Sequence, residues 1–116
     1  MTASSSAPSA EVVSVGADRL AVRGALTFAT ARRASEAGLR AIGASAGRKL
    51  EIDFAPVTAA DSAGLAVCLV WLARARRDGC ALGFANLPAS IRALARISEV
   101  EQLIDRRDLA KADGAG

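Results

Sequence analysis

Hydrophobic and polar residues alternate over several short stretches of this chain, a pattern typical of strands with one buried face. The sequence Gly16-Ala17-Asp18 is a turn signal between the first two stretches, so these predict a β-hairpin. Residues 55–60 are expected to form a connection, since Pro56 stops the strand before it. The predicted strands cover residues 12–15, 19–23, 49–54 and 81–85.

Longer stretches between the strands have apolar residues at helical spacing. Phe28 is expected on the apolar stripe of the first helix, and Gly38 weakens that helix. The predicted helices cover residues 27–42, 62–77 and 88–97, followed by a short helix or turn at 100–104. The order ββαβαβαα predicts a single α/β domain, with a mixed sheet of about four strands covered by three to four helices.

The ends of the chain differ from this pattern. Residues 1–10 are small and polar, without the basic and apolar regions of a signal peptide, and are expected to be a disordered lead-in. The domain is expected over residues 11–109 and a flexible tail over 110–116. The longest apolar run, 65–73, is too short to span a bilayer, so a cytoplasmic protein without membrane insertion is expected.

The predicted helix at 62–77 is apolar on every face over residues 65–73, so it must be buried or covered. Leu65, Leu69 and Leu72 are expected to form its core row. Val67, Val70, Trp71 and Arg74 fall towards the other side, and we expect Trp71 to be partly exposed there. The sequence therefore predicts that part of this helix contacts another protein.

The charged and reactive residues exclude several function classes. The net charge of +3 is mild, its arginines are scattered, and stacking aromatics are few, which argues against nucleic-acid binding. With no histidine and no Cys-x-x-Cys spacing, Cys68 and Cys80 provide neither a zinc site nor a Cys–His nucleophile. We expect no cofactor, no metal and no catalytic activity.

Asp61 and Ser62 stand just before the apolar helix and allow two interpretations. Either residue is a good helix N-cap. Alternatively, Ser62 is a phosphorylation site, because a helix N-terminus accommodates a phosphate and the added charge would disrupt an apolar contact.

The segment Asp61-Ser62-Ala63-Gly64-Leu65, preceded by the strand at 50–54, resembles the helix start of STAS domains. That family includes bacterial anti-sigma-factor antagonists and the tails of anion transporters. A narrower resemblance is to the small MlaB-like subunits of Mla-type ABC transporters. It is carried by Trp71-Leu72, Ala75, Gly79, Phe84-Ala85-Asn86-Leu87-Pro88, Leu94-Ala95-Arg96-Ile97 and Val100.

The resemblance implies a STAS fold and two alternative functions. One is an accessory subunit that binds the ATPase of a phospholipid-transporting ABC complex, peripheral to the inner membrane through its partners. The other is an anti-sigma-factor antagonist that an anti-sigma kinase phosphorylates on Ser62. Ala63, where sigma-pathway proteins commonly have a second serine, favours the transporter. Ala25, where many relatives have an acid, weakens any role for the first loop.

Both functions use the same predicted surface at the start of the helix. The predicted partner-binding residues are Asp61, Ser62, Ala63, Leu65, Val67, Val70, Trp71 and Arg74.

Overall fold

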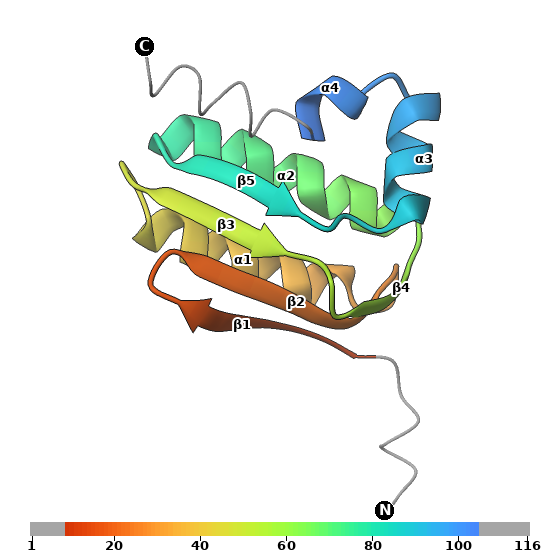
Figure 1. Cartoon of the computed structure of the whole chain (residues 1–116), viewed down its shortest axis with the longest axis horizontal. Coiled ribbons are helices and arrows are strands. Elements are labelled where there is room, and N and C mark those ends of the chain that lie inside the picture. The colour runs from red at the N-terminus through yellow and green to blue at the C-terminus, as the bar shows by residue number, and fades with distance from the viewer. Residues whose placement is uncertain (1–8, 105–116) are drawn as a thin grey trace, which may run out of the picture.

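The computed structural model describes residues 9–104, which form one layer of strands and one of helices (Figure 1). The predicted lead-in and tail lie outside these residues, apart from Ser9 and Ala10. In chain order the elements are β1 (Ala10–Gly16), β2 (Arg19–Leu26), α1 (Ala31–Ala44), β3 (Lys49–Asp53), β4 (Val57–Ala60), α2 (Ser62–Asp78), β5 (Ala81–Ala85), α3 (Ala89–Ile97) and α4 (Glu101–Ile104).

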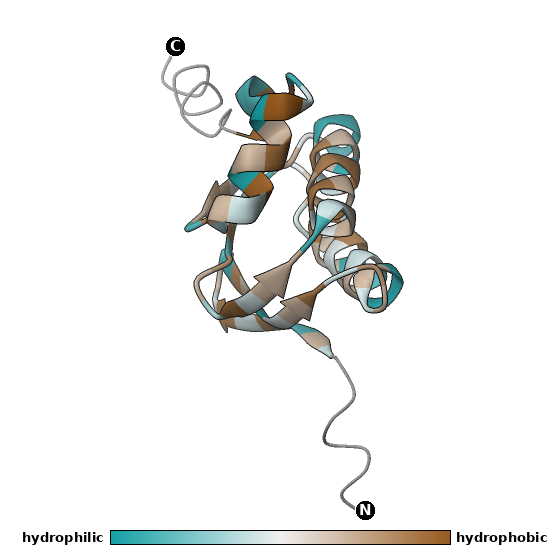
Figure 2. Ribbon diagram, turned by 90° about the vertical axis from the view of Figure 1, so that its right-hand side faces the viewer, coloured by the Kyte–Doolittle hydropathy of each residue, from teal (hydrophilic) through white to brown (hydrophobic). Residues whose placement is uncertain are grey.

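The sheet is mixed, with strand order β1-β2-β3-β5, and the predicted hairpin is its first pair. The strands β1 and β2 are antiparallel, whereas β2, β3 and β5 run parallel. Helices α1 and α2 provide the crossovers between parallel strands and pack side by side on one face (Figures 1 and 2).

The sheet contains one strand more than the pattern predicts. The segment expected as a connection includes β4, which pairs with β2 in parallel beyond the end of β3. A turn separates β3 from β4, with the Val57 N–H donating to the Phe54 carbonyl at 3.0 Å. Only four residues long and without a fully buried side chain, β4 has no alternating apolar pattern to reveal it.

Most of the chain's few aromatic residues meet in the core between the sheet and α2. Phe54 lies between Phe84, at a ring-centroid distance of 5.4 Å and nearly edge-on, and Trp71, at 6.3 Å. All three side chains are buried. Apart from Cys68 and Cys80, the other buried hydrophobic residues are aliphatic. No helix within residues 9–104 has the length and apolarity needed to cross a bilayer.

Candidate functional site

The start of α2 is held in place by Asp61, whose two carboxylate oxygens accept hydrogen bonds from two different segments. Oδ1 accepts from the Ala63 N–H at 2.9 Å, which makes Asp61 the N-cap of the helix. Oδ2 accepts from the Phe28 N–H at 3.1 Å, in the loop between β2 and α1. Asp61 therefore ties this loop to the N-terminus of α2, and its carboxylate is used structurally.

Gly64 explains why the helix start lies so close to the sheet. A Cβ atom at this position would be 3.2 Å from the Leu26 carbonyl oxygen and 3.1 Å from the Ile91 side chain. Glycine thus allows the first turn of α2 to approach the end of β2. In the segment Asp61-Ser62-Ala63-Gly64, the aspartate caps the helix, the serine exposes its hydroxyl, and the glycine allows the helix to lie close to β2.

The loop before α1 projects an aromatic residue into solvent. The buried Thr30 hydroxyl donates to the Ala25 carbonyl at 2.7 Å and accepts from the Thr27 N–H at 3.0 Å, which closes a tight turn. Phe28 sits on this turn and is 86% exposed. The expectation that Phe28 belongs to the apolar stripe of the first helix is wrong, because the turn delays the helix to Ala31.

Beyond the cap, α2 presents an exposed strip without charge. We call Ser62, Ala66, Val70 and Ala73 the α2 strip; all four are exposed, and they recur every three or four residues. Val70 is 45% exposed. Arg77 continues the strip at the C-terminal end, where a cation suits the helix dipole.

The predicted exposure of Trp71 is wrong. The side chain is 0% exposed, and its indole N–H donates to the Ser35 carbonyl of α1 at 3.1 Å. The physical reason is Gly38, whose missing side chain leaves a notch in α1: a Cβ there would lie only 2.3 Å from the indole ring. The part of the expected partner face that contains Trp71 is therefore covered by α1, whereas Val70 stays exposed.

Other predicted site residues divide between core and surface. Leu65 and Val67 are buried and, like Trp71, offer a partner little or no surface in this conformation. Leu69 and Leu72, expected in the core row, are only partly buried. The guanidinium of Arg74 is held by Asp78, with Nε 2.7 Å from Oδ2. Partner contact stays a prediction for Asp61, Ser62, Ala63, Val70 and Arg74.

The reactive groups among the described residues are buried or isolated. Burial raises the pKa of the Cys68 thiol to about 12, and burial together with Asp78 raises the pKa of Cys80. Both thiols are therefore protonated and poorly nucleophilic at neutral pH. Within residues 9–104 no group of three or more His, Cys, Asp or Glu side chains could hold a metal ion. What the site presents is an exposed hydroxyl, an exposed aromatic ring and a small uncharged helix face.

Comparisons with known proteins agree on the fold. A family model described as "Mlab, STAS domain" matches residues 10–105. The solved structure of the anti-sigma factor antagonist SpoIIAA in its unphosphorylated form is similar, with a TM-score of 0.58 and 16% identity over 76% of this chain and 82% of that chain. No curated protein sequence matches this chain significantly.

A second solved structure, an anti-sigma-factor antagonist (STAS) domain protein from Planctomyces limnophilus, has a TM-score of 0.64 at 12% identity. The match covers 90% of this chain and 97% of that chain. At such low identity these two structures bear on the fold alone. The STAS fold expected from the sequence is confirmed.

Proposed function

The chain belongs to the STAS-domain family described as MlaB, and on that premise we propose that it is an accessory subunit binding the ATPase of an Mla-type ABC complex. The subunit has no reaction of its own. By supporting the ATPase, it contributes to the phospholipid transport that maintains outer-membrane lipid asymmetry. It is cytoplasmic and reaches the inner membrane through the ATPase and permease.

The observation that carries this proposal is the α2 strip beside the exposed ring of Phe28. Small side chains at Ala66 and Ala73 let another protein approach the helix closely, and Val70 adds apolar area. Aromatic residues are enriched at the centres of protein interfaces. Covering the ring of Phe28 contributes roughly 1.5–3 kcal/mol to the free energy of binding a partner.

The rigid connection between these two features supports a preformed docking surface. Asp61 accepts hydrogen bonds from the Phe28 backbone and from the helix start, so the backbone that carries the ring is fixed beside the N-terminus of α2. A surface that is already ordered loses little conformational entropy on binding. We expect the partner to present an apolar surface that is complementary in shape to α2 and to the loop that carries Phe28.

A second function, anti-sigma-factor antagonism, is favoured by Ser62. Its side chain is exposed at the first position of a 17-residue helix. A phosphate there would lie at the positive end of the helix dipole, which favours a negative charge, while Asp61 keeps the Ala63 N–H as the N-cap. The same phosphate would place about two negative charges beside the α2 strip and oppose an apolar partner.

An affinity pull-down of the tagged full chain from its own cells distinguishes the two functions. Recovery of an ABC ATPase with its permease, identified by mass spectrometry, supports the transporter subunit. Recovery of a kinase-like anti-sigma factor, followed by phosphate on Ser62, supports the antagonist. Recovery of neither class contradicts both proposals.

Two substitutions of one residue then test the docking surface. Ser62→Glu should weaken partner binding at least about tenfold relative to Ser62→Ala, because a desolvated charge costs more than a lost hydroxyl. Both variants should unfold at nearly the same urea concentration, since an acid near a helix N-terminus is tolerated. Equal losses of binding would indicate that the hydroxyl itself, and not the absence of charge, matters at this position.

A further inference from the structure

The two long helices carry an excess of positive charge. Within residues 9–104, α1 and α2 contain six arginines and two acidic residues, whereas the five strands contain three basic and three acidic residues. The two helices pack side by side on one face of the sheet (Figure 1). Arginines that are scattered along the sequence therefore gather on one side of the folded chain.

Two of these arginines point away from the sheet. Arg33 and Arg40 of α1 are exposed and seven residues apart, which is about two turns, so they lie on one face of the helix. That face is opposite the buried residues of α1, which are Ala34, Gly38 and Ile42. The α2 strip likewise lies opposite the buried residues of its helix. The outer faces of both helices therefore form one continuous surface.

Two arginines of α2 border the strip at its C-terminal end. Both helices connect parallel strands and so run in the same direction, which brings Arg40 to the same end as Arg74 and Arg77. Arg74 lies in the seam between the helices, since a Cβ at Gly43 of α1 would be 3.3 Å from its guanidinium. The side chain of Arg77 is 74% exposed. We call Arg33, Arg40, Arg74 and Arg77 the basic rim.

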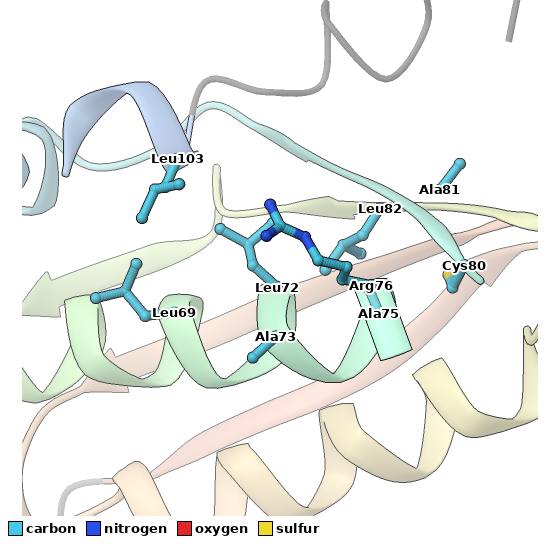
Figure 3. A pocket seen from close by; sticks show the side chains of 9 residues that line it. All are labelled: Leu69, Leu72, Ala73, Ala75, Arg76, Cys80, Ala81, Leu82 and Leu103. Atoms are coloured by element: carbon cyan, nitrogen blue, oxygen red, sulfur yellow. The ribbon is translucent and has the colours of Figure 1, made fainter. Parts of the chain in front are cut away.

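The other two arginines of these helices do not belong to the rim. Arg32 has its Nε 3.8 Å from a carboxylate oxygen of Glu36, one turn later, which partly balances its charge. Arg76 lines an apolar groove between α2, β5 and α4, on the side of α2 away from α1 (Figure 3). The leucines that line this groove are Leu69, Leu72, Leu82 and Leu103.

The fold accounts for half of the basic rim. Arg74 and Arg77 both lie near Asp78, in the C-terminal part of α2, where a cation suits the helix dipole. Arg33 lies in the first turn of α1, where the dipole disfavours a cation and no acid is present. Within residues 9–104, neither Arg33 nor Arg40 forms an ion pair. These two charges are available to another molecule.

An uncharged centre with a charged border is the arrangement of a protein interface. Packed helices lie about 8–10 Å apart, so Arg33 and Arg40 are within reach of a protein seated on the α2 strip. Carboxylates at the edge of that protein would pair with the guanidinium groups, whereas basic residues there would be repelled. A nucleic acid fits less well, since the strip has neither a charge nor an aromatic ring. A membrane fits less well, since Val70 is the strip's only large apolar residue.

We propose that the α2 strip binds a protein surface that is apolar at its centre and bordered by carboxylates facing Arg33 and Arg40. This inference rests on the proposed function, in which the partner is the ATPase, and adds the charge of the ATPase surface to it. Opposite charges at the border of an interface mainly accelerate the encounter and fix the orientation of the partners.

The test measures the rate constant for association of the full chain with the purified ATPase recovered in the pull-down. The test variants are Arg33→Glu and Arg40→Glu, and the matched control is Arg23→Glu, which changes the net charge equally. Arg23 is exposed on β2 and alternates with Val22, which is in the core, so it lies on the face of the sheet away from the helices. Each rate is measured at about 0.1 M and about 1 M salt, between which the screening length falls from about 10 Å to about 3 Å.

At the lower salt concentration, Arg33→Glu and Arg40→Glu should each slow association at least about threefold relative to Arg23→Glu, and at the higher concentration the difference should disappear. Wild-type binding with equal rates in the three variants would overturn this inference and leave the proposed function standing. An ATPase that does not bind the wild-type chain would overturn both. Binding of a DNA duplex or of anionic lipid vesicles that Arg33→Glu and Arg40→Glu abolish, and Arg23→Glu does not, would assign the basic rim to a polyanion and overturn the inference.

Discussion

Substituting Gly38 by alanine provides the sharpest test of the packing between α1 and α2. Within a helix, alanine is preferred to glycine by about 1 kcal/mol, so this change would normally stabilise the protein. Here the added Cβ would lie 2.3 Å from Cε2 and 2.4 Å from Nε1 of Trp71. Carbon atoms in contact prefer about 3.5–4.0 Å, so the ring or the helix must move by more than an ångström.

The cost of that movement exceeds the gain in helix propensity. The indole ring is fully buried, with its centroid 6.3 Å from that of Phe54, so moving it disturbs the packing of the core. Overpacking of this kind costs about 1–3 kcal/mol. Displacing the ring also breaks its hydrogen bond to Ser35, worth roughly 1 kcal/mol. We therefore expect Gly38→Ala to lower the free energy of unfolding by about 1–3 kcal/mol.

The assay is urea unfolding followed by circular dichroism, with Gly43→Ala in the same helix as the matched control. A Cβ at Gly43 meets only the end of the flexible Arg74 side chain, at 3.3 Å, so the control should be neutral or stabilising. With a urea m-value near 1.5 kcal/mol/M, the urea midpoint of Gly38→Ala should fall by roughly 0.7–2 M. If both variants were stabilised alike, the notch for Trp71 would not exist.

Three further outcomes are expected. Trp71→Ala should lower the free energy of unfolding by about 3–5 kcal/mol, measured in urea, so a loss of partner binding in this variant would reflect the fold. Phe28→Ser should change stability by less than about 0.5 kcal/mol but weaken partner binding at least tenfold in a titration with the recovered partner; unchanged affinity would remove the ring from the interface. Because burial raises the pKa of Cys68 to about 12, folding keeps this thiol protonated while the unfolded chain ionises above pH ~8.5. The free energy of unfolding should therefore fall by up to about 1.4 kcal/mol per pH unit between that pH and 12, and urea midpoints at pH 8 and 10 should differ less in Cys68→Ala.

The sequence pattern correctly predicts the elements whose side chains are buried at regular intervals along the chain. Leu50 and Ile52 alternate along β3, Phe54 directly after the strand continues the alternation, and all three side chains are buried. The hairpin of β1 and β2 follows from a turn signal between two apolar stretches. The boundaries of α2 follow from a good cap and a terminal glycine, and the observed helix is Ser62–Asp78 against the predicted 62–77.

Two features of the site escape the pattern because they depend on long-range geometry. The exposure of Phe28 results from the hydrogen bonds of Thr30 to its own loop and of Asp61 to the Phe28 backbone, 33 residues away in sequence. The four residues of β4 pair with β2 through the backbone and bury no side chain fully. Neither arrangement leaves a periodic trace in the sequence.

The sequence pattern also predicts the wrong orientation of α2. A helix that is apolar on every side has no polar face to show which side is exposed to solvent. Two apolar stripes compete for the core, and the larger residues of each can be buried. The neighbouring helix decides which stripe of α2 is buried. Gly38 of α1 leaves room for the indole ring of Trp71, so the side of α2 that contains Trp71 faces α1, and Val67 and Ala75 are buried with it. Leu69 and Leu72 are thereby left at the edge of the groove, and the small residues of the α2 strip face solvent. One glycine in α1 thus determines which surface of α2 is available to another protein, although it lies far from that surface in sequence.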